Sequence, residues 1–348
     1  MLTRIEKIKN ADDLIISDAG EILRQGGLVA FPTETVYGLG ADALDEKASA
    51  KIYESKGRPS DNPLIVHIAD WEALSKIAKS ISENAKKLAD AFWPGPLTMI
   101  FEKQDIVPLG TTGGLGTVAV RMPSHSVALE LIRQGGGYVA APSANSSGRP
   151  SPTKAEHVAE DLNGKIDMIL DGGEVGIGIE STIVDMSGDI PMILRPGYIT
   201  KEMLEQVVGR VDVDPAILGD RDTKERPKAP GMRYKHYAPR AELTLVQGET
   251  EKVIQSINEL VAKAATEGKK AGIIASDETF SRYTGGMCKS IGTRQDEDTI
   301  ARNLYGILRD FDASGVDLIY SEVFATPKLG QAIMNRLLKA AGHHIMYV

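Results

Sequence analysis

The chain has 348 residues, of which 42% are hydrophobic and 25% are charged, and it contains one cysteine, Cys288. A chain of this length is longer than one domain with a single hydrophobic core usually is, so we predict two domains. The composition is that of a soluble globular protein. One cysteine excludes an intramolecular disulfide and a zinc cluster built on cysteines, which indicates a reducing compartment.

The sequence shows no sign of secretion or membrane insertion. The N-terminal stretch MLTRIEKIKNADD has no apolar segment of the signal-peptide type. No later stretch offers the roughly 18 uncharged apolar residues in a row that a membrane span needs. We therefore expect a cytoplasmic protein without a membrane partner.

The net charge of −8 is distributed unevenly along the chain. Residues 1–200 carry 19 Lys and Arg against 27 Asp and Glu, whereas residues 201–348 carry 21 of each kind. Long-range attraction of a polyanion is therefore disfavoured, and a phosphate group must be bound by a local cluster. Besides Lys56 and Arg58, the densest candidate is the segment 221–240, with seven cations and two acids.

The first 200 residues alternate β-rich runs with amphipathic helical patterns. Runs bounded by Gly and Pro predict strands at 27–33, 63–68, 97–102, 117–122, 138–143, 167–173 and 181–186. Hydrophobic periodicity predicts helices at 45–56, 82–93, 125–134 and 153–164. In the last helix Thr153 and Glu156 have the spacing of a capping box, and Gly164 marks its end. These elements predict a twisted mixed sheet covered by helices.

The pattern changes after Gly209. About 30 residues rich in Asp, Lys, Arg and Pro predict a linker or a functional loop. Regular elements then return, with predicted strands at 241–248, 270–276 and 316–323 and helices at 250–268, 299–315 and 326–342. This alternation predicts a smaller, doubly wound, Rossmann-like α/β domain, whose last helix begins at Thr326 and Pro327. We thus predict domains at 1–205 and 241–348, joined by a linker at 206–240.

Several familiar catalytic motifs are missing from the sequence. There is no G-x-x-x-x-G-K-[ST] loop, no G-x-G-x-x-G fingerprint, no H-E-x-x-H set and no G-x-S-x-G elbow. We therefore expect neither a metal held by protein side chains nor a serine nucleophile.

Polar side chains instead lie at the ends of the predicted strands, beside Gly or Pro. They lie in FPTETVYGLGAD, KGRPSDNP, APSANSSGRPSPT, GIESTIVDM, and the strand ends that carry Arg121 and Arg195. Taken alone, each has an ordinary explanation, such as a turn with satisfied hydroxyls or a solvated pair of cations. Together they indicate a site that binds anions and positions reactants, as nucleotidyl or phosphoryl transfer requires.

The same motifs carry a family resemblance. FPTETVYGLGADA, KGRPSDNPLIVHI, FWPGPLTMIF, APSANSSGRPSPT, IESTIVDM and ILRPGYIT, in this order, resemble the YrdC-like family. The match runs from about residue 14 to residue 200. The linker PGMRYKHYAP and residues 241–348 resemble, more loosely, the long two-domain form of that family.

The resemblance implies a reaction and its partners. L-threonine, bicarbonate and ATP give threonylcarbamoyl-adenylate and pyrophosphate, with Mg²⁺ accompanying ATP. A downstream tRNA threonylcarbamoyl transferase complex then passes the threonylcarbamoyl group to the adenosine next to the anticodon.

The resemblance also implies roles for individual residues. The nucleotide phosphates are placed at Lys56, Arg58, Ser143 and Asn145, of which Lys56 and Arg58 are the catalytic candidates. The rest of the ATP site is placed at Asn62, Thr117, Ser151 and Arg195, and a lid from the linker adds Tyr234 and His236. The threonine pocket is placed at Thr35, His67, Arg121, Ala141 and Ser181.

Two of these residues suggest a specific chemistry. Arg121 suits the substrate carboxylate, because a guanidinium donates two parallel hydrogen bonds. His67 has a reference pKa near neutrality and suggests a general base, although we favour an orienting hydrogen-bond partner.

Two alternatives stay open. One is an RNA-binding module, because YrdC-like domains present a concave basic surface; the acidic N-terminal half and the 5% aromatic content count against it, but a weak RNA contact in a local cationic groove is compatible. The other is a related carbamoyl-adenylate-forming enzyme of hydrogenase maturation. Such enzymes carry zinc-finger cysteines, which this chain lacks.

Overall fold

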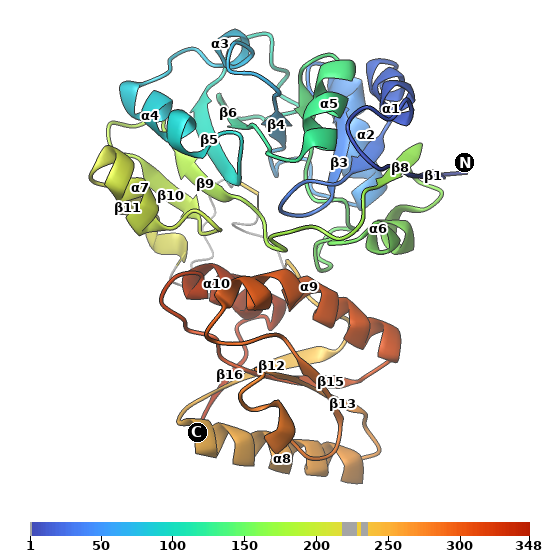
Figure 1. The fold of residues 1–348 in the computed structure, drawn as a ribbon, viewed down its shortest axis with the longest axis vertical. Helices are drawn as coiled ribbons and strands as arrows, with labels where there is room; N and C mark the ends of the chain where they lie inside the picture. The colour runs from blue at the N-terminus through green and yellow to red at the C-terminus, as the bar shows by residue number, and fades with distance from the viewer. Residues whose placement is uncertain (1, 218–227, 231–235) are drawn as a thin grey trace. The chain divides into compact units, whose positions relative to one another are not determined.

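The computed structural model describes residues 2–217, 228–230 and 236–348. Contacts between Cα atoms divide the chain into two compact units (Figure 1). Unit 1 comprises Met1–Ser147, Ser151–Gly176 and Glu180–Arg233, and unit 2 comprises Gly148–Pro150, Ile177–Ile179 and Tyr234–Val348. The boundaries 1–205, 206–240 and 241–348 stay a prediction, because much of the predicted linker lies outside the described residues.

The described strands of unit 1 form an eleven-stranded sheet in the order β1-β8-β2-β3-β7-β4-β6-β5-β9-β10-β11. They are β1 (Arg4–Lys7), β2 (Val29–Phe31), β3 (Gly38–Asp42), β4 (Ile65–His67), β5 (Leu97–Glu102), β6 (Thr117–Arg121), β7 (Val139–Ala140), β8 (Met168–Asp171), β9 (Thr182–Asp185), β10 (Met192–Arg195) and β11 (Asp212–Val213). Parallel and antiparallel pairs both occur: β4 pairs parallel with β6 and antiparallel with β7. The predicted mixed sheet is confirmed.

Helices cover this sheet, and its core has two sides. The helices are α1 (Ile15–Arg24), α2 (Glu46–Lys56), α3 (Leu74–Ile77), α4 (Glu83–Phe92), α5 (Ser126–Gln134), α6 (Ala155–Leu162) and α7 (Lys201–Val208), followed by the short 3₁₀ helix η1 (Pro215–Ile217). Successive residues of a strand face opposite sides, so Ala30 of β2 belongs to one apolar cluster while Val29 and Phe31 belong to another. Helices α1 and α5 pack closely (Figure 1). A Cβ added to Gly20 of α1 would lie only 2.5 Å from Cβ of Gln134 at the end of α5, so no larger residue fits there without a shift.

The local signals of α2 explain its ends. Asp45 caps its N-terminus by accepting a hydrogen bond from the backbone N of Lys47 at 2.8 Å. Gly57 follows its last residue with φ of 62°, in the left-handed region that favours glycine. The capping box predicted for α6 is wrong: the N-cap is Lys154, without a side-chain cap, and the backbone N of Thr153 instead donates to Nδ1 of His157 at 3.2 Å.

Unit 2 is built on a parallel sheet in the order β14-β13-β15-β12-β16, as far as its residues are described. Its elements are β12 (Glu242–Gln247), α8 (Thr250–Thr266), β13 (Ala271–Ala275), η2 (Phe280–Arg282), β14 (Met287–Ser290), α9 (Glu297–Ser314), β15 (Leu318–Glu322), α10 (Gly330–Ala340) and β16 (Ile345–Tyr347). Helix α8 covers one face, while α9 and α10 cover the other (Figure 1). The predicted doubly wound parallel sheet is confirmed.

Two details of unit 2 differ from the prediction. The prediction passes directly from the strand at 270–276 to the helix at 299–315, whereas the structure has the 3₁₀ helix η2 and the strand β14 between them. Helix α10 begins at Gly330, after the N-cap Leu329, and not at the predicted Thr326 and Pro327. None of the helices among the described residues is long and apolar enough to cross a membrane.

Candidate functional site

The predicted Lys-x-Arg and Ser-x-Asn motifs are in direct contact in unit 1. Lys56 is the last residue of α2 and is 4% exposed. Its Nζ donates hydrogen bonds to the backbone carbonyls of Ser143, at 2.5 Å, and of Asn145. In the same loop Oγ of Ser143 donates to Oδ1 of Asn145 at 2.5 Å. The cation thus contacts two backbone carbonyls of the loop that carries Ser143 and Asn145.

Arg58, Asn62 and Thr117 lie at the beginning of β4. Arg58 donates through Nε to the carbonyl of Asn62 at 3.2 Å and through Nη2 to that of Pro63 at 3.0 Å. Thr117 is the first residue of β6, which pairs in parallel with β4 and sets Ala119 opposite Ile65. Asn62 is 1% exposed, and its Oδ1 has no hydrogen-bond partner among the described residues. A buried acceptor of this kind is available to an N–H or O–H group of a ligand.

Ser151 and Arg195 are buried around the segment that precedes β9. Oγ of Ser151 donates to Oε1 of Glu180 at 2.5 Å. Arg195, the last residue of β10, donates through Nε to the carbonyl of Ser181 and through Nη2 to its Oγ, both at 3.1 Å. These two predicted ATP-site residues therefore lie beside Ser181, a predicted threonine-pocket residue.

The predicted threonine pocket centres on Arg121, at the end of β6. His67 is its register partner on β4, and Thr98 is its register partner on β5. Nη1 of Arg121 donates to Oγ1 of Thr35 at 2.9 Å. Oγ of Ser181 lies 2.8 Å from Oγ1 of Thr98. Arg121 thus has Thr35 as a hydrogen-bond partner and His67 and Thr98 as strand neighbours, and Thr98 in turn contacts Ser181.

Ala141 completes the predicted set and joins its two halves. Its backbone N donates to the carbonyl of Ile65, the first residue of β4, at 2.9 Å. The phosphate-binding candidates lie at the beginning of β4, and His67 and Arg121 lie at the ends of β4 and β6. Because a strand rises about 3.3 Å per residue, β4 spans only about 10 Å. The two predicted subsites are therefore close enough for one extended molecule.

His67 is neutral at physiological pH. It is 3% exposed, its Nδ1 lies 3.2 Å from the carbonyl of Ile65, and its ring contacts Phe31 edge-on. Burial, and to a smaller extent the charge of Arg121, lower the pKa of His67 to about 3. So weak a base does not hold a proton at neutral pH, which favours the orienting role over general-base catalysis.

Glu34 is a candidate that the sequence reasoning did not single out. Its Oε1 lies 2.7 Å from Nη2 of Arg121, and both side chains are largely buried. The contact is an ion pair without aligned hydrogen bonds: both Glu34 oxygens and Nη2 of Arg121 lack a hydrogen-bond partner among the described residues. The sequence reasoning singled out this loop for its other polar residues, such as Thr35, and not for Glu34.

Of the two predicted lid residues, Tyr234 lies outside the described residues. His236 is described, and its ring centroid lies 5.5 Å from that of Tyr237. The lid stays a prediction.

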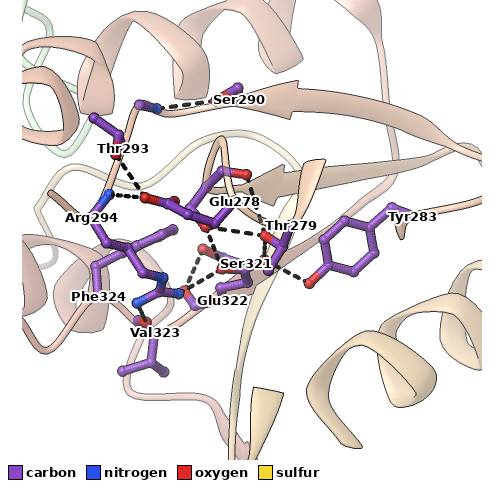
Figure 2. Close-up of polar contacts among 12 residues, drawn as sticks. Glu278, Thr279, Tyr283, Ser290, Thr293, Arg294, Ser321, Glu322, Val323 and Phe324 are labelled. Carbon is purple, nitrogen blue, oxygen red and sulfur yellow. Dashed lines mark hydrogen bonds and ion pairs between the residues drawn. The ribbon is translucent and has the colours of Figure 1, made fainter. Parts of the chain in front are cut away.

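Unit 2 also contains a buried glutamate, and its carboxylate is saturated with hydrogen-bond donors (Figure 2). Glu322, at the end of β15, is 2% exposed. It accepts hydrogen bonds from Tyr283 at 2.8 Å, from Arg294 at 2.6 Å and from Ser276 at 3.3 Å, and a short one from Thr279. A carboxylate offers about four lone-pair positions, so this network has used all of them.

The same network borders a cavity of about 320 Å³. Its walls come largely from the ends of β12 and β15 and from the first turns of α8, where an α/β sheet commonly binds ligands. Arg294, the cation in this wall, is held by Glu322 and by the ring of Phe324, 5.0 Å from its guanidinium carbon. The polar side chains here chiefly stabilise one another.

Two family models match this chain. The model Sua5_yciO_yrdC, described as "Telomere recombination", matches residues 21–197. The model Sua5_C, described as "Threonylcarbamoyl-AMP synthase, C-terminal domain", matches residues 199–342.

Individual relatives match over nearly the whole chain. The threonylcarbamoyl-AMP synthase of Pyrococcus abyssi is 52% identical over 335 residues, covering 95% of each chain. That of Bacillus subtilis is 49% identical over 338 residues, covering 97% of this chain and 96% of the other. The crystal structure of P. abyssi Sua5 complexed with L-threonine matches with a TM-score of 0.93 at 50% identity, covering 99% of this chain and 100% of that one.

Proposed function

The chain belongs to the Sua5/YciO/YrdC family, together with the threonylcarbamoyl-AMP synthases that it matches over nearly its whole length, and we propose how its residues make threonylcarbamoyl-AMP from L-threonine, bicarbonate and ATP. The family resemblance seen in the sequence motifs is thereby confirmed. The match to a relative solved with L-threonine, together with the cluster around Arg121, carries the proposal.

The chemistry has two steps. The ammonium group of threonine loses one proton, and the resulting amine combines with bicarbonate to give a carbamate and water. A carbamate oxygen then attacks the α-phosphorus of ATP, so that a new O–P bond forms and pyrophosphate leaves with the electron pair of the broken bond. A transfer of this kind needs positioned reactants and charge stabilisation more than a protein nucleophile.

The phosphates of ATP bind at the beginning of β4, between Lys56, Arg58, Ser143 and Asn145. The contact between Lys56 and the loop 143–145 supports this placement, because it gathers a cation with several polar groups. Asn62, Thr117, Ser151 and Arg195 form the remainder of the ATP site. The unsatisfied Oδ1 of Asn62 is the acceptor there that a nucleotide N–H or O–H satisfies.

Threonine binds at the ends of β4 and β6. Arg121 takes its carboxylate, and Thr35, His67 and Ser181 contact its other polar groups, with Ala141 forming part of the pocket wall. The neutral imidazole of His67 orients the substrate and carries no charge of its own at neutral pH.

A divalent ion fits these residues when it arrives with the nucleotide. Among the described residues no group of three or more His, Cys, Asp and Glu side chains has the arrangement of a metal site. Mg²⁺ prefers oxygen ligands and binds mostly through phosphates and water. Oγ of Ser143 and Oδ1 of Asn145 are oxygen atoms that would supplement those ligands. When bound, the ion neutralises charge on the pyrophosphate leaving group.

The remaining partners follow from the product. A tRNA threonylcarbamoyl transferase complex consumes the adenylate, and a weak contact with RNA is compatible with a local cationic groove. Since the consumer of the product modifies tRNA, we place the protein in the cytoplasm.

The experiment incubates the full chain with ATP, bicarbonate and labelled threonine, and follows pyrophosphate and labelled adenylate. We expect pyrophosphate release that depends on both threonine and bicarbonate, and an Arg58→Gln variant that loses it while keeping the melting temperature. Lys86→Gln, on the exposed face of α4, is the matched control. Pyrophosphate release that proceeds equally without threonine contradicts the proposed function.

A further inference from the structure

The starting point is the unusual state of the Glu34 carboxylate. Both of its oxygens are buried, yet neither accepts a hydrogen bond from any residue that the structure describes. Buried carboxylates are almost always hydrogen-bonded, because removing a charge from water is costly. An acceptor left open in a candidate substrate pocket is therefore a position for a donor that comes with a ligand.

Two further unsatisfied groups lie in the same place. Nη2 of Arg121, 2.7 Å from Glu34, and Nδ1 of His125 are buried without a hydrogen-bond partner among the described residues. Burial lowers the pKa of His125 while the charge of Glu34 acts in the opposite direction, so the carboxylate is close to this ring. The open hydrogen-bonding capacity is thus concentrated around one ion pair.

Arg121 does not need Glu34 to stay in place. Its Nη1 donates to Oγ1 of Thr35 at 2.9 Å, and its Nε donates to the carbonyl of Gly95 at 3.3 Å. These two bonds fix the plane of the guanidinium, since its five N–H donors have a rigid geometry. Glu34 therefore adds to the pocket a negative charge that the orientation of Arg121 does not require.

The charges of the substrate explain why the pocket contains the negative charge of Glu34. Free threonine is a zwitterion, with a carboxylate and an ammonium group on the same carbon atom. Arg121 complements the carboxylate, and the neutral His67 offers no charge to the ammonium. Glu34, directly beside Arg121, provides the missing complement, and the substrate enters without changing the net charge of the pocket.

We propose that Glu34 and Arg121 form a two-point recognition site for the zwitterion of threonine, in which Arg121 binds the α-carboxylate and Glu34 binds the α-ammonium. The inference rests on the proposed function and names a specificity residue within it. It concerns the binding of threonine before its amine reacts.

The test separates the ammonium from the rest of the substrate. Isothermal titration measures the affinity for L-threonine and for 2,3-dihydroxybutanoate, in which a hydroxyl replaces the ammonium. We expect the unmodified chain to bind threonine at least about tenfold more tightly than this analogue, as for a charge-assisted contact in a buried site. In Glu34→Gln we expect this ratio to narrow to within about threefold, chiefly by weaker binding of threonine.

A control variant and the possible outcomes distinguish a failure of this inference from a failure of the proposed function. Glu21→Gln makes the same change in an exposed ion pair with Arg24, and it should keep the ratio of the unmodified chain. If the unmodified chain binds no threonine, the proposed function fails. If it binds threonine and Glu34→Gln keeps the same ratio, only the present inference is overturned.

A second variant and a measurement on the unmodified chain keep the inference testable if Glu34→Gln does not fold. Thermal unfolding is recorded first, and Glu34→Asp, which keeps the charge, should retain part of the preference for threonine. Equal affinities of the unmodified chain for threonine and for the analogue also overturn the inference.

Discussion

Each unit of the molecule contains an arginine–glutamate pair with a largely buried carboxylate, although the Arg294 side chain of unit 2 is 36% exposed, and the two pairs have nearly the same length. Arg121 and Glu34 in unit 1 are 2.7 Å apart, and Arg294 and Glu322 in unit 2 are 2.6 Å apart. They differ in how the carboxylate is satisfied: Glu322 accepts hydrogen bonds from four side chains, whereas Glu34 accepts none from the described residues.

The difference shows that the distance within an ion pair does not reveal its purpose. A saturated carboxylate has no capacity left for a ligand and holds its own neighbours in place. An unsaturated carboxylate costs stability until a ligand supplies donors, and such costs are concentrated at functional sites. We therefore interpret the pair in unit 2 as a stabilising network, and the pair in unit 1 as the binding site that we propose.

The same substitution in the two arginines should give opposite results. In Arg121→Gln we expect kcat/KM for threonine to fall by about 100- to 1000-fold, because a charge-assisted contact with the substrate carboxylate is lost. In Arg294→Gln we expect threonine-dependent pyrophosphate release within about twofold of normal, but a lower free energy of unfolding. A comparable loss of activity in both variants would remove the distinction between the pairs.

The glutamates should differ in what they contribute to stability. Glu322→Gln should lower the free energy of unfolding by about 2 to 3 kcal/mol. At least one of the donors that now contact the carboxylate would then face an amide NH₂, and Arg294 would lose its charge partner. Glu34→Gln should cost less, since it breaks no hydrogen bond among the described residues and Arg121 keeps two acceptors. Urea unfolding of both variants gives the ranking, and the reverse order contradicts our interpretation of Glu322.

The neutral state of His67 makes the unit 1 site sensitive to acid. Its pKa is about 3 in the folded chain, against an ordinary value of 6.5, so the unfolded chain binds the proton more readily. The stabilisation is complete above about pH 6.5 and is lost as the pH falls toward 3, by up to about 1.4 kcal/mol per pH unit. We expect His67→Asn to flatten the fall of melting temperature between pH 7 and pH 4.5. An unchanged slope would mean that His67 takes up a proton in the folded state.

The sequence predicted the elements whose signals are local. Strand β5 lies at the predicted residues 97–102, and α2 follows its Asp45 cap and ends at Gly57. Strand β3, with the sequence GLGAD, was missed because its two glycines give no alternating pattern, and only pairing with β2 and β7 makes it a strand. The cap predicted at Thr153 was wrong because the backbone N of Thr153 donates to the ring of His157, four residues later, a contact that the capping-box spacing does not predict.

The candidate site shows the same division between local and distant information. Motif resemblance singled out Thr35 and Arg121, and the structure brings these side chains into contact. It did not single out Glu34, because the meaning of a buried carboxylate depends on a partner that is distant in the sequence and on donors that are absent. The sequence alone does not show whether a carboxylate is buried or whether it accepts hydrogen bonds.

The smallest effect that we predict concerns a single donor of the unit 2 network. Burial and the nearby Glu322 raise the pKa of Tyr283, so its hydroxyl stays protonated and donates to Glu322. Tyr283→Phe should lower the free energy of unfolding by about 1 kcal/mol, because Ser276, Thr279 and Arg294 still satisfy the carboxylate. Tyr347→Phe, at a side chain that is 72% exposed, is the control and should change nothing. If Tyr283→Phe instead leaves stability intact and lowers threonine-dependent pyrophosphate release, the unit 2 pair takes part in catalysis and the contrast between the two pairs is wrong.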